Sequence, residues 1–294
     1  MPGSPVYFRH SGIFIRRPAR LSRLFSYLCR MMYVRAKKAL GQHFLKDESV
    51  ALRITGSLVF PAGEEPVQVL EIGPGTGVLT KYLLENPRIR LQVAEIDPES
   101  VEYLKETFPQ LLYTLQQQDF LTMPLDKIFD GNFYVIGNFP YNISSQIFFR
   151  ILEYKEHIPQ VVCMLQKEVA ERLAGKPGTK TYGILSVLLQ TWYEIEYLFT
   201  VDEHVFLPPP KVKSAVIRLM KNDRNSLGCD EKLFKQVVKT TFNQRRKTIR
   251  NSVKPLLGGR PAPVNDLFDR RPEQLSVEQF AELTRLVSEI ISGK

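Results

Sequence analysis

The 294-residue sequence has only three cysteines, and no two of them are close enough to form a C-x-x-C pair. Scattered cysteines in an odd number predict neither a disulfide framework nor a structural zinc site, and they fit a reducing, cytosol-like compartment. The sequence also lacks any run near the roughly 18 apolar residues that a membrane-spanning helix requires. We therefore expect a cytoplasmic protein without a metal site or a membrane partner.

Acidic residues are missing from the first 46 positions, which hold ten Lys and Arg. The rest of the chain then has 40 − 10 = 30 basic and 31 acidic residues, so this leader alone creates the net charge of +9. Two interpretations stay open for residues 1–38. They form a flexible or over-long start, with Met31 or Met32 as an equivalent first residue, or an Arg-rich transit segment for a mitochondrion or plastid.

Short apolar runs alternate with helical stretches through the middle of the chain, and Asp47 is predicted to cap the first helix. Strands are predicted at 67–73, 91–97, 113–119, 133–138 and 160–166, with helices between them. Such alternation predicts a parallel sheet covered by helices on both faces. Two further strands, at 194–201 and 214–220, are joined by the proline-rich FLPPPKVK and are expected to complete the sheet in antiparallel fashion.

Beyond residue 222 the periodicity is helical only. Helices are predicted over 231–242, 246–257 and 276–291, and no strand candidate remains. We therefore expect three parts: the basic leader (1–38), a Rossmann-like α/β domain (39–222) and a small all-helical domain (229–294).

Three predicted strands end in glycine or acidic residues at the same rim of the sheet. Gly73 and Gly75 follow the first strand, where glycine lets the backbone turn tightly and approach a ligand. Glu95 ends the second strand and suits the hydroxyls of a ribose, while Asp119 ends the third strand, where an adenine amine would lie. Such glycine turns also occur in NAD and FAD binders, or only to pack a helix on a sheet. Their coincidence with two acids predicts a nucleoside cofactor.

The fourth strand ends in Asn138-Phe139-Pro140-Tyr141, a set that a simple turn does not need. The amide oxygen of Asn138 and the carbonyl of Pro140 could accept the two N–H bonds of a ring-conjugated amine and free its lone pair to attack a methyl group. Tyr141 could stack on a base that has left its helix or loop. The motif thus predicts methylation of an exocyclic amine, without a general base.

These motifs resemble the KsgA-type ribosomal RNA adenine dimethyltransferases. The NFPY segment looks like the N-[LIVF]-P-Y signature of S-adenosylmethionine-dependent adenine-N6 methyltransferases. Eight further segments match in order between residue 39 and about residue 257: ALGQHFLKD, EIGPGTG, AEID, QQD, MLQKEVAERL, YGILSV, VFLPPPKVKSAVIRL and TFNQRRKTIRNS. The resemblance implies the sheet of a class I methyltransferase, with S-adenosylmethionine as methyl donor and S-adenosylhomocysteine as product.

The resemblance also implies roles that the residue pattern alone does not assign. His43 and Leu45, in GQHFL, are expected against the methionine end of the cofactor, and relatives often have Asn in place of His43. Asn138 is expected to contact the cofactor as well as the target amine. Phe206 is expected to face Tyr141 across the flipped adenine, although ordinary core packing is the alternative.

Four basic residues lie together in NQRRKTIRN, within a body whose charge is otherwise balanced: Arg245, Arg246, Lys247 and Arg250. They predict a phosphate-contact patch for RNA, in preference to a solvated helix face. The resemblance implies an enzyme that dimethylates N6 of two adjacent adenosines in the 3′-terminal hairpin of small-subunit ribosomal RNA during subunit assembly. We expect the protein to be a monomer. Two alternatives stay open: a large-subunit adenine methyltransferase, and a non-catalytic assembly or organellar transcription factor with the same fold.

Overall fold

The computed structural model describes residues 34–293, so the predictions for residues 1–33 of the leader lie outside the described part. A seven-stranded mixed sheet in the order β4-β3-β2-β5-β6-β9-β7 forms the centre. Its strands are β2 (Val67–Ile72), β3 (Ile89–Glu95), β4 (Leu115–Gln117), β5 (Phe133–Asn138), β6 (Gln160–Gln166), β7 (Tyr193–Val201) and β9 (Ser214–Lys221). The predicted strand positions are confirmed within two residues, except that β4 has only three residues.

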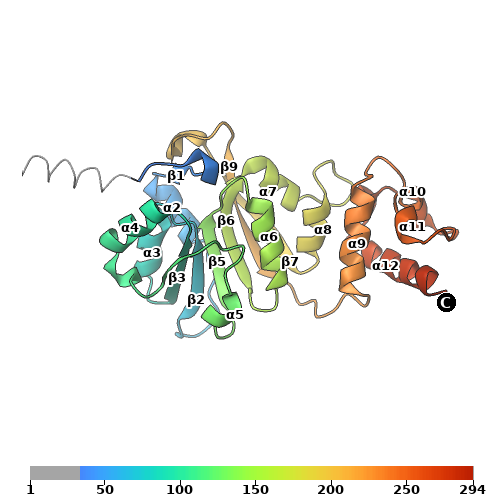
Figure 1. Ribbon diagram of the computed structural model, residues 1–294, viewed down its shortest axis with the longest axis horizontal. Helices are drawn as coiled ribbons and strands as arrows, with labels where there is room; N and C mark the ends of the chain where they lie inside the picture. The colour runs from blue at the N-terminus through green and yellow to red at the C-terminus, as the bar shows by residue number, and fades with distance from the viewer. Residues whose placement is uncertain (1–33, 294) are drawn as a thin grey trace, which may run out of the picture.

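The order of the parallel strands reverses between β2 and β5. From β2 the chain adds β3 and then β4 on one side, and it returns to place β5 on the other side of β2. β6 follows parallel to β5, whereas β9 lies between β6 and β7 and runs antiparallel to both. In open α/β sheets, ligands bind at the carboxyl ends of the strands where the order reverses. The topology therefore directs attention to the ends of β2 and β5 (Figure 1).

Alternate residues of the central strands face two separate hydrophobic clusters, as the period of two in a strand requires. Val135 and Val161 belong to the cluster covered by α5 (Leu125–Ile128), α6 (Ser144–Glu153), α7 (Lys167–Leu173) and α8 (Ile184–Gln190). Ile136 and Val162 belong to the cluster covered by α2 (Glu48–Thr55), α3 (Val78–Glu85) and α4 (Pro98–Thr107). Helices on both faces of a mainly parallel sheet confirm the predicted α/β class.

Aspartate side chains fix the starts of the two helices α2 and α4. The carboxylate of Asp47 accepts hydrogen bonds from the backbone N–H groups of Ser49 and Val50, which confirms the predicted cap. Asp97 accepts one from Glu99, and Pro98 occupies the first turn of α4. Because Asp97 lies two residues beyond the end of β3, this cap also sets where the chain leaves the rim of the sheet.

A short two-stranded sheet, which the sequence pattern did not predict, joins the start of the described chain to the proline-rich segment. β1 (Phe44–Leu45) pairs antiparallel with β8 (Phe206–Leu207), and Leu45 lies opposite Phe206. A 3-10 turn, Glu203–Val205, precedes β8. This pairing holds residues 44–45 beside the carboxyl ends of the large sheet.

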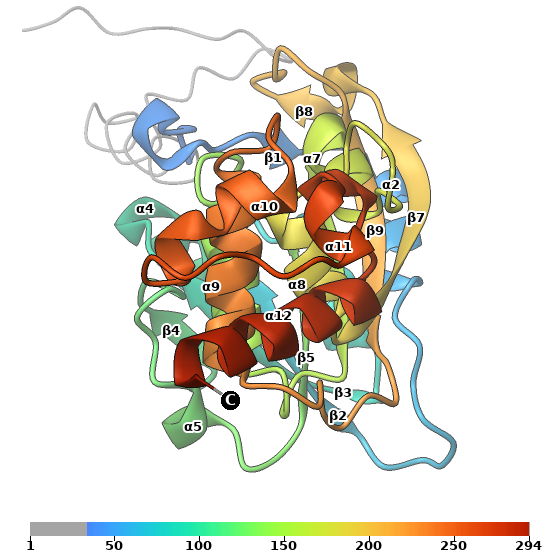
Figure 2. The ribbon, with the colours of Figure 1, turned by 90° about the vertical axis from the view of Figure 1, so that its right-hand side faces the viewer.

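The chain beyond β9 is helical: α9 (Glu231–Phe242), α10 (Ile249–Ser252), α11 (Asp266–Asp269) and α12 (Val277–Ser292). The predicted helix over 246–257 is wrong as a continuous element, because turns occupy 243–247 and a 3-10 turn follows at Lys254–Leu256. The backbone N–H of Ile249 donates to the carbonyl of Arg270, outside any helical ladder, and Pro255 has no N–H to donate. Figure 2 shows α12 running across α9, with α10 and α11 above it.

The C-terminal helices share a hydrophobic core with one face of the sheet. Leu152 and Trp192 belong to the same buried cluster as Phe234 and Phe280. The ring of Phe242 on α9 lies 5.9 Å from that of Phe280 on α12. The helical part therefore packs directly beyond α8, at one end of the long axis of the molecule (Figure 1). The domain boundaries at 38/39 and at 222/229 stay predictions.

Candidate active site

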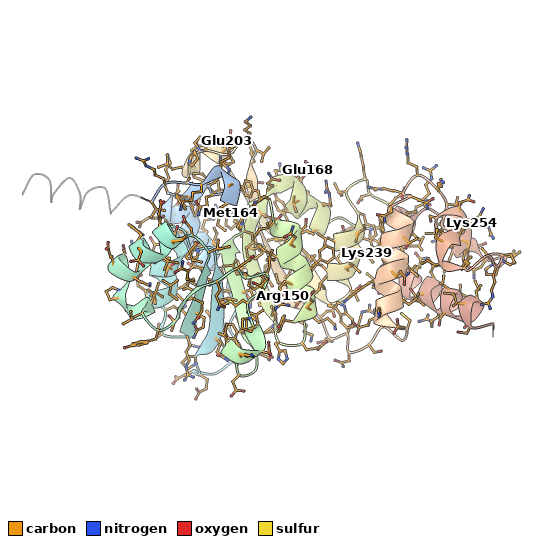
Figure 3. The ribbon with its side chains drawn as sticks, in the orientation of Figure 1. Arg150, Met164, Glu168, Glu203, Lys239 and Lys254 are labelled. Atoms are coloured by element: carbon orange, nitrogen blue, oxygen red, sulfur yellow. The ribbon has the colours of Figure 1, made fainter. Side chains whose placement is uncertain are left out.

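One pocket opens at the rim where β2, β3, β4 and β5 end. It is lined by residues 40–45, 71–76, 78–79, 94–96, 118–120, 138–141 and 143. These segments are distant in sequence but meet because parallel strands bring their carboxyl ends to one edge. Figure 3 marks the same edge with Glu203, above β1, and with Glu168, at the start of α7. The pocket therefore contains every predicted cofactor residue: His43, Leu45, Gly73, Gly75, Glu95, Asp119 and Asn138.

The glycine turn leaves room for a ligand and for one aromatic ring. Gly73 and Gly75 both have left-handed backbone conformations, with φ of 63° and 59°. A Cβ atom at Gly73 would meet no atom within 4 Å, which leaves open space over the turn. A Cβ at Gly75 would lie 2.7 Å from the ring of Phe44, so glycine is needed there for close packing. Sequence reasoning missed Phe44 because its contact depends on the pairing of β1 with β8.

Glu95 links the end of β3 to the glycine turn. Its Oε1 accepts from the backbone N–H groups of Ile96 at 2.9 Å and Asp97 at 2.8 Å, and its Oε2 accepts from Gly75 at 3.2 Å. Burial raises the pKa of this carboxyl, while these three hydrogen bonds act in the opposite direction. A carboxylate has further lone pairs. Glu95 is therefore placed to hold a sugar hydroxyl without releasing the turn.

Asn138 ends β5 with its side-chain amide in a fixed orientation. Its Nδ2 donates a hydrogen bond of 2.9 Å to the carbonyl oxygen of His43. Its Oδ1 is buried and has no hydrogen-bond partner among the described residues. The carbonyl of Pro140 accepts a hydrogen bond of 3.3 Å from the N–H of Ile143 and keeps a second lone pair. An acceptor without a partner at the pocket wall suits a ligand that donates N–H bonds.

Tyr141 presents its ring at the pocket and anchors its hydroxyl behind it. The ring stacks against that of His43, with 5.4 Å between centroids. The hydroxyl lies 2.5 Å from Oγ of Ser214, at the start of β9. Burial raises the pKa of this phenol, so the side chain is neutral at physiological pH. The Nδ1–H of His43 donates to the carbonyl of Pro208 at 2.8 Å, which occupies this nitrogen.

Phe206 does not reach the pocket, which corrects the prediction that it faces Tyr141. Its side chain is only 1% exposed and belongs to the hydrophobic cluster of Leu45 and Val216. The pairing of β8 with β1 places Phe206 opposite Leu45. Core packing, the alternative raised from the sequence, is what the structure shows, and the ring beside Tyr141 is that of His43.

Glu71 also lines the pocket, although it was not among the predicted cofactor residues. It lies near the end of β2, and its Oε2 accepts a hydrogen bond of 2.6 Å from the hydroxyl of Thr80 on α3. Its Oε1 is buried and has no partner in the described chain. Burial, with a smaller contribution from the charge of Glu95, raises the pKa of Glu71 to about 8. The sequence signal that could have identified Glu71 is an acidic residue inside an otherwise apolar predicted strand, VQVLEIG.

Residues 37–45 form a strap that lines one side of the pocket with residues 40–45 and is held at both ends, by Lys37 and by the pairing of β1 with β8. The Nζ of Lys37 lies 2.5 Å from the buried Oδ1 of Asp97, and Nε2 of Gln42 donates to Oδ2 of Asp97 at 3.3 Å. Between these two residues, the carbonyl of Ala39 accepts a hydrogen bond of 3.4 Å from the side chain of Asn142. The strap thus connects the β3 end, the β5 end and β8 around the same pocket.

Of the four basic residues in the predicted phosphate patch, two are exposed to solvent and two contact other parts of the chain. Arg246 and Lys247 are exposed in the turns after α9. Arg245 donates to the carbonyl of Thr179 at 3.2 Å, which joins this turn to the α7–α8 loop. Arg250 pairs with Asp269 at 2.9 Å and donates to two backbone carbonyls of the 262–263 segment. Arg250 therefore holds the helical part together, which corrects its assignment to a free RNA-contact surface.

Within residues 34–293, no group of three or more His, Cys, Asp or Glu is arranged to hold a metal ion. None of the helices in this range has the length and apolar character needed to cross a membrane.

Comparison with known proteins gives a consistent result. The sequence profile of the family described as "Ribosomal RNA adenine dimethylase" matches residues 33–289. A protein of Parabacteroides distasonis named "Ribosomal RNA small subunit methyltransferase A" is 63% identical over 256 residues, which cover 86% of this chain and 94% of the relative. A protein of the same name from Bacteroides thetaiotaomicron is 59% identical over 265 residues, which cover 89% of this chain and 97% of the relative.

Two solved structures share the fold over most of the chain. A dimethyladenosine transferase from Plasmodium falciparum has a TM-score of 0.67 at 24% identity, and the match covers 85% of this chain and 98% of that chain. The 23S rRNA methyltransferase ErmE has a TM-score of 0.60 at 26% identity, and the match covers 82% of this chain and 99% of that chain. Both support the predicted Rossmann-like class I methyltransferase fold.

Proposed function

The chain belongs to the ribosomal RNA adenine dimethylase family, and on this premise we propose that it transfers methyl groups from S-adenosylmethionine to N6 of two adjacent adenosines in the 3′-terminal hairpin loop of small-subunit ribosomal RNA. The names of relatives at 55–63% identity support the small subunit as the source of the substrate. The observation that carries the chemistry is the buried Oδ1 of Asn138, without a partner in residues 34–293, at the wall of a pocket built around a glycine turn.

The pocket fits the proposed cofactor in the chemistry of its donor set. Gly73 leaves open space where a ligand approaches the backbone. Glu95 and Asp119 line the pocket from the ends of successive strands and supply acceptors for sugar hydroxyls and for an adenine amine. His43 and Leu45 line it from the strap. Bound S-adenosylmethionine would supply an electrophilic methyl group.

Asn138 and Pro140 prepare the target amine for attack. The N6 lone pair of adenine is delocalised into the ring. Two acceptors that hold both N–H bonds pull the nitrogen towards tetrahedral geometry and localise the lone pair. Asn138 supplies the free acceptor, while the carbonyl of Pro140 already accepts from Ile143 and contributes its remaining lone pair. As the N–C bond forms, the C–S bond breaks, and the methylated ammonium loses its proton to water.

Tyr141 provides the stacking surface for a base that has left the RNA loop. Its hydroxyl is held by Ser214 and its ring packs on His43, so the ring is oriented before the base arrives. Stacking on an aromatic side chain contributes about 1–3 kcal/mol per base. The neutral phenol does not act as a base. Recognition of the surrounding RNA would rest on its shape and phosphates.

The test is transfer of labelled methyl groups to purified small ribosomal subunits that lack the modification. We expect dimethyladenosine at two adjacent positions of the 3′-terminal hairpin in a mass-spectrometric digest of the RNA. Transfer to large-subunit RNA would place the chain with activities of the ErmE kind, to which its structure is also similar. Tight binding of cofactor and subunit without transfer would indicate a non-catalytic assembly factor.

A further inference from the structure

A second hollow opens at the same rim of the sheet, beyond the end of β6. It is lined by residues 166–168, 171 and 212–213, and Glu168, labelled in Figure 3, is one of them. Because β6 runs parallel to β5, its carboxyl end lies on the same side of the sheet as Asn138. The volume of the hollow is about 360 Å³, which is within the range of small-ligand sites. The proposed methyl transfer uses none of its lining residues.

Tyr141 lies between this hollow and the cofactor pocket. Its side chain lines the pocket, and its hydroxyl lies 2.5 Å from Oγ of Ser214. Ser214 is paired with Gln166 in the register of β9 and β6, and neighbouring strands lie about 5 Å apart. The backbone N–H of Lys167 donates to the carbonyl of Lys213 at 2.9 Å, which joins the two walls of the hollow. The hollow therefore begins directly behind the contact that anchors the Tyr141 ring.

The charged side chains that line the hollow are paired within the protein. Lys213 lies 2.5 Å from a carboxylate oxygen of Asp202, and Lys167 lies 3.7 Å from one of Glu171. Glu168 pairs at 2.9 Å with an arginine one turn later in α7. The two lysines and the two glutamates of the lining also cancel in net charge. The hollow is therefore suited to a neutral nucleobase, in preference to a phosphate group.

The two uncharged side chains of the lining match the edge and the face of a base. Gln166 is half-buried and is the N-cap residue of α7, but its side chain makes no capping hydrogen bond. A glutamine amide fits the N6 and N7 edge of adenine, to which it offers one acceptor and one donor. Val212 is 46% exposed and offers an apolar contact to the face of the ring.

We propose that this hollow holds the adenosine next to the target while the target is stacked on Tyr141, and that Gln166 binds the N6 and N7 edge of that neighbouring base. The inference rests on the proposed function, in which the two target adenosines are adjacent. Since the hollow lies on one side of the ring, it serves one of the two targets. The contact changes how fast that target is methylated and leaves the methylated position the same.

The test is single-turnover methyl transfer by the full chain to small ribosomal subunits that lack the modification, resolved by position with mass spectrometry. Three substrates are compared: the intact adenosine pair, and the two pairs in which either adenosine is replaced by guanosine. Guanosine presents O6 in place of the N6 amine and so has no proton for the glutamine oxygen. We expect one of the two replacements to slow transfer to the remaining adenosine by about 5- to 150-fold.

Gln166→Ala should lose this preference for a neighbouring adenosine. Its rate on the intact pair should fall close to its rate on the guanosine pair, whereas a merely structural role would lower both rates by the same factor. Gln110→Ala, an exposed change in the Pro109–Leu111 turn, is the matched control and should keep the wild-type preference. A preference of wild-type size in Gln166→Ala would overturn the proposal.

A phosphate in the hollow would give a different pattern. Replacement of Lys167 and Lys213 by methionine would then flatten the salt dependence of binding to the intact subunit, because two phosphate contacts are lost. The wild type would at the same time show no preference for a neighbouring adenosine. These results together would refute a base site.

Two further outcomes separate this inference from the function on which it rests. If Gln166→Ala does not fold, as judged by circular dichroism, the wild type decides the question, and equal rates at the remaining adenosine in all three substrates would refute the proposal. Failure of the proposed function would instead appear as absence of methyl transfer to the intact pair by the wild type.

Discussion

The side-chain Nδ2 of Asn138 donates a hydrogen bond of 2.9 Å to the backbone carbonyl of His43, which lies 95 residues earlier in the chain. This bond fixes the orientation of the amide, and Oδ1 of Asn138 is left buried without a partner in the described structure. The orientation of the proposed catalytic acceptor thus depends on the strap that also lines the proposed cofactor pocket. The proposed cofactor site and the proposed target-amine site therefore share one contact.

Replacement of Asn138 by alanine should abolish methyl transfer while cofactor binding stays measurable. Loss of one preorganised polar contact to a reacting group costs about 10²–10³ in kcat. Single-turnover transfer to unmodified small subunits measures the loss, and calorimetry measures cofactor affinity. Asn132→Ala, an exposed change just before the opposite end of β5, is the control and should leave both unchanged. Near-normal turnover of Asn138→Ala would remove this residue from the mechanism.

Tyr141→Phe and Tyr141→Ala should differ sharply. The phenylalanine keeps the ring beside His43 and loses only the contact with Ser214, so we expect a change of a few-fold in kcat/KM. The alanine loses the stacking surface, and about 1–3 kcal/mol of base stacking corresponds to roughly a 5- to 150-fold loss. Equal loss in both variants would show that the hydroxyl, and not the ring, carries the function of Tyr141.

Lys37→Met should weaken cofactor binding more than Lys38→Met does. Lys37 pairs with the buried carboxylate of Asp97 and so fixes the strap, whereas Lys38 is exposed. Because Lys37 is itself 36% exposed, solvent screens the pair, and we expect no more than a several-fold increase in Kd. Calorimetric titration of both variants with S-adenosylmethionine measures the difference, and indistinguishable affinities would mean that the strap does not need this anchor.

Neutralising Arg246 and Lys247 together should flatten the salt dependence of RNA binding. Loss of two phosphate contacts lowers the slope of log K against log salt concentration by about 1.5. Arg250→Gln is the informative comparison, because this side chain pairs with Asp269 inside the helical part. It should lower the temperature of unfolding and leave the salt slope intact. The reverse result would place the RNA contact at Arg250.

Glu71 should make the stability of the cofactor-free protein fall as pH rises. The pKa of Glu71 is about 8 in the folded protein and 4.5 as an ordinary glutamate. Between these values the folded state holds a proton that the unfolded state has lost, so this contribution to stability is full below pH 4.5 and disappears as pH approaches 8.

In Glu71→Gln the neutral amide removes this dependence. As pH rises from 4.5 to 8, the unfolding free energy of the variant minus that of the wild type should increase by about 1.4 kcal/mol per pH unit. Above pH 8 this difference should stay constant. Urea unfolding at stepwise pH values measures the difference. Parallel profiles for the two proteins would show that the carboxyl is not buried in its neutral form.

The central architecture was predictable because its signals are local. Alternating apolar runs located the strands, and Asp47 located a helix start. The strand-end motifs were correctly placed around one pocket because parallel topology alone brings them there. A cytoplasmic location and a monomeric state likewise stay predictions from the sequence.

The wrong predictions depend on contacts between distant segments. Phe206 became a core residue because β8 pairs with β1, which no local pattern indicates. The helix predicted over 246–257 is interrupted where Ile249 donates to Arg270. Arg250 was assigned to RNA because its partner Asp269 lies 19 residues later, in a helix of only four residues. Local periodicity describes the faces of an element but not what covers them.

The hydrophobic cluster that joins the sheet to α8, α9 and α12 also determines how far the basic turn after α9 lies from the pocket. The turn with Arg246 and Lys247 and the amide of Asn138 are parts of one packed body, so the separation between them is constant. An RNA loop that contacts both must present its adenosine at that separation from its bound phosphates. The protein would then choose its base by position along a folded RNA, and changes in neighbouring bases that preserve the shape of the loop would leave the methylated position unchanged.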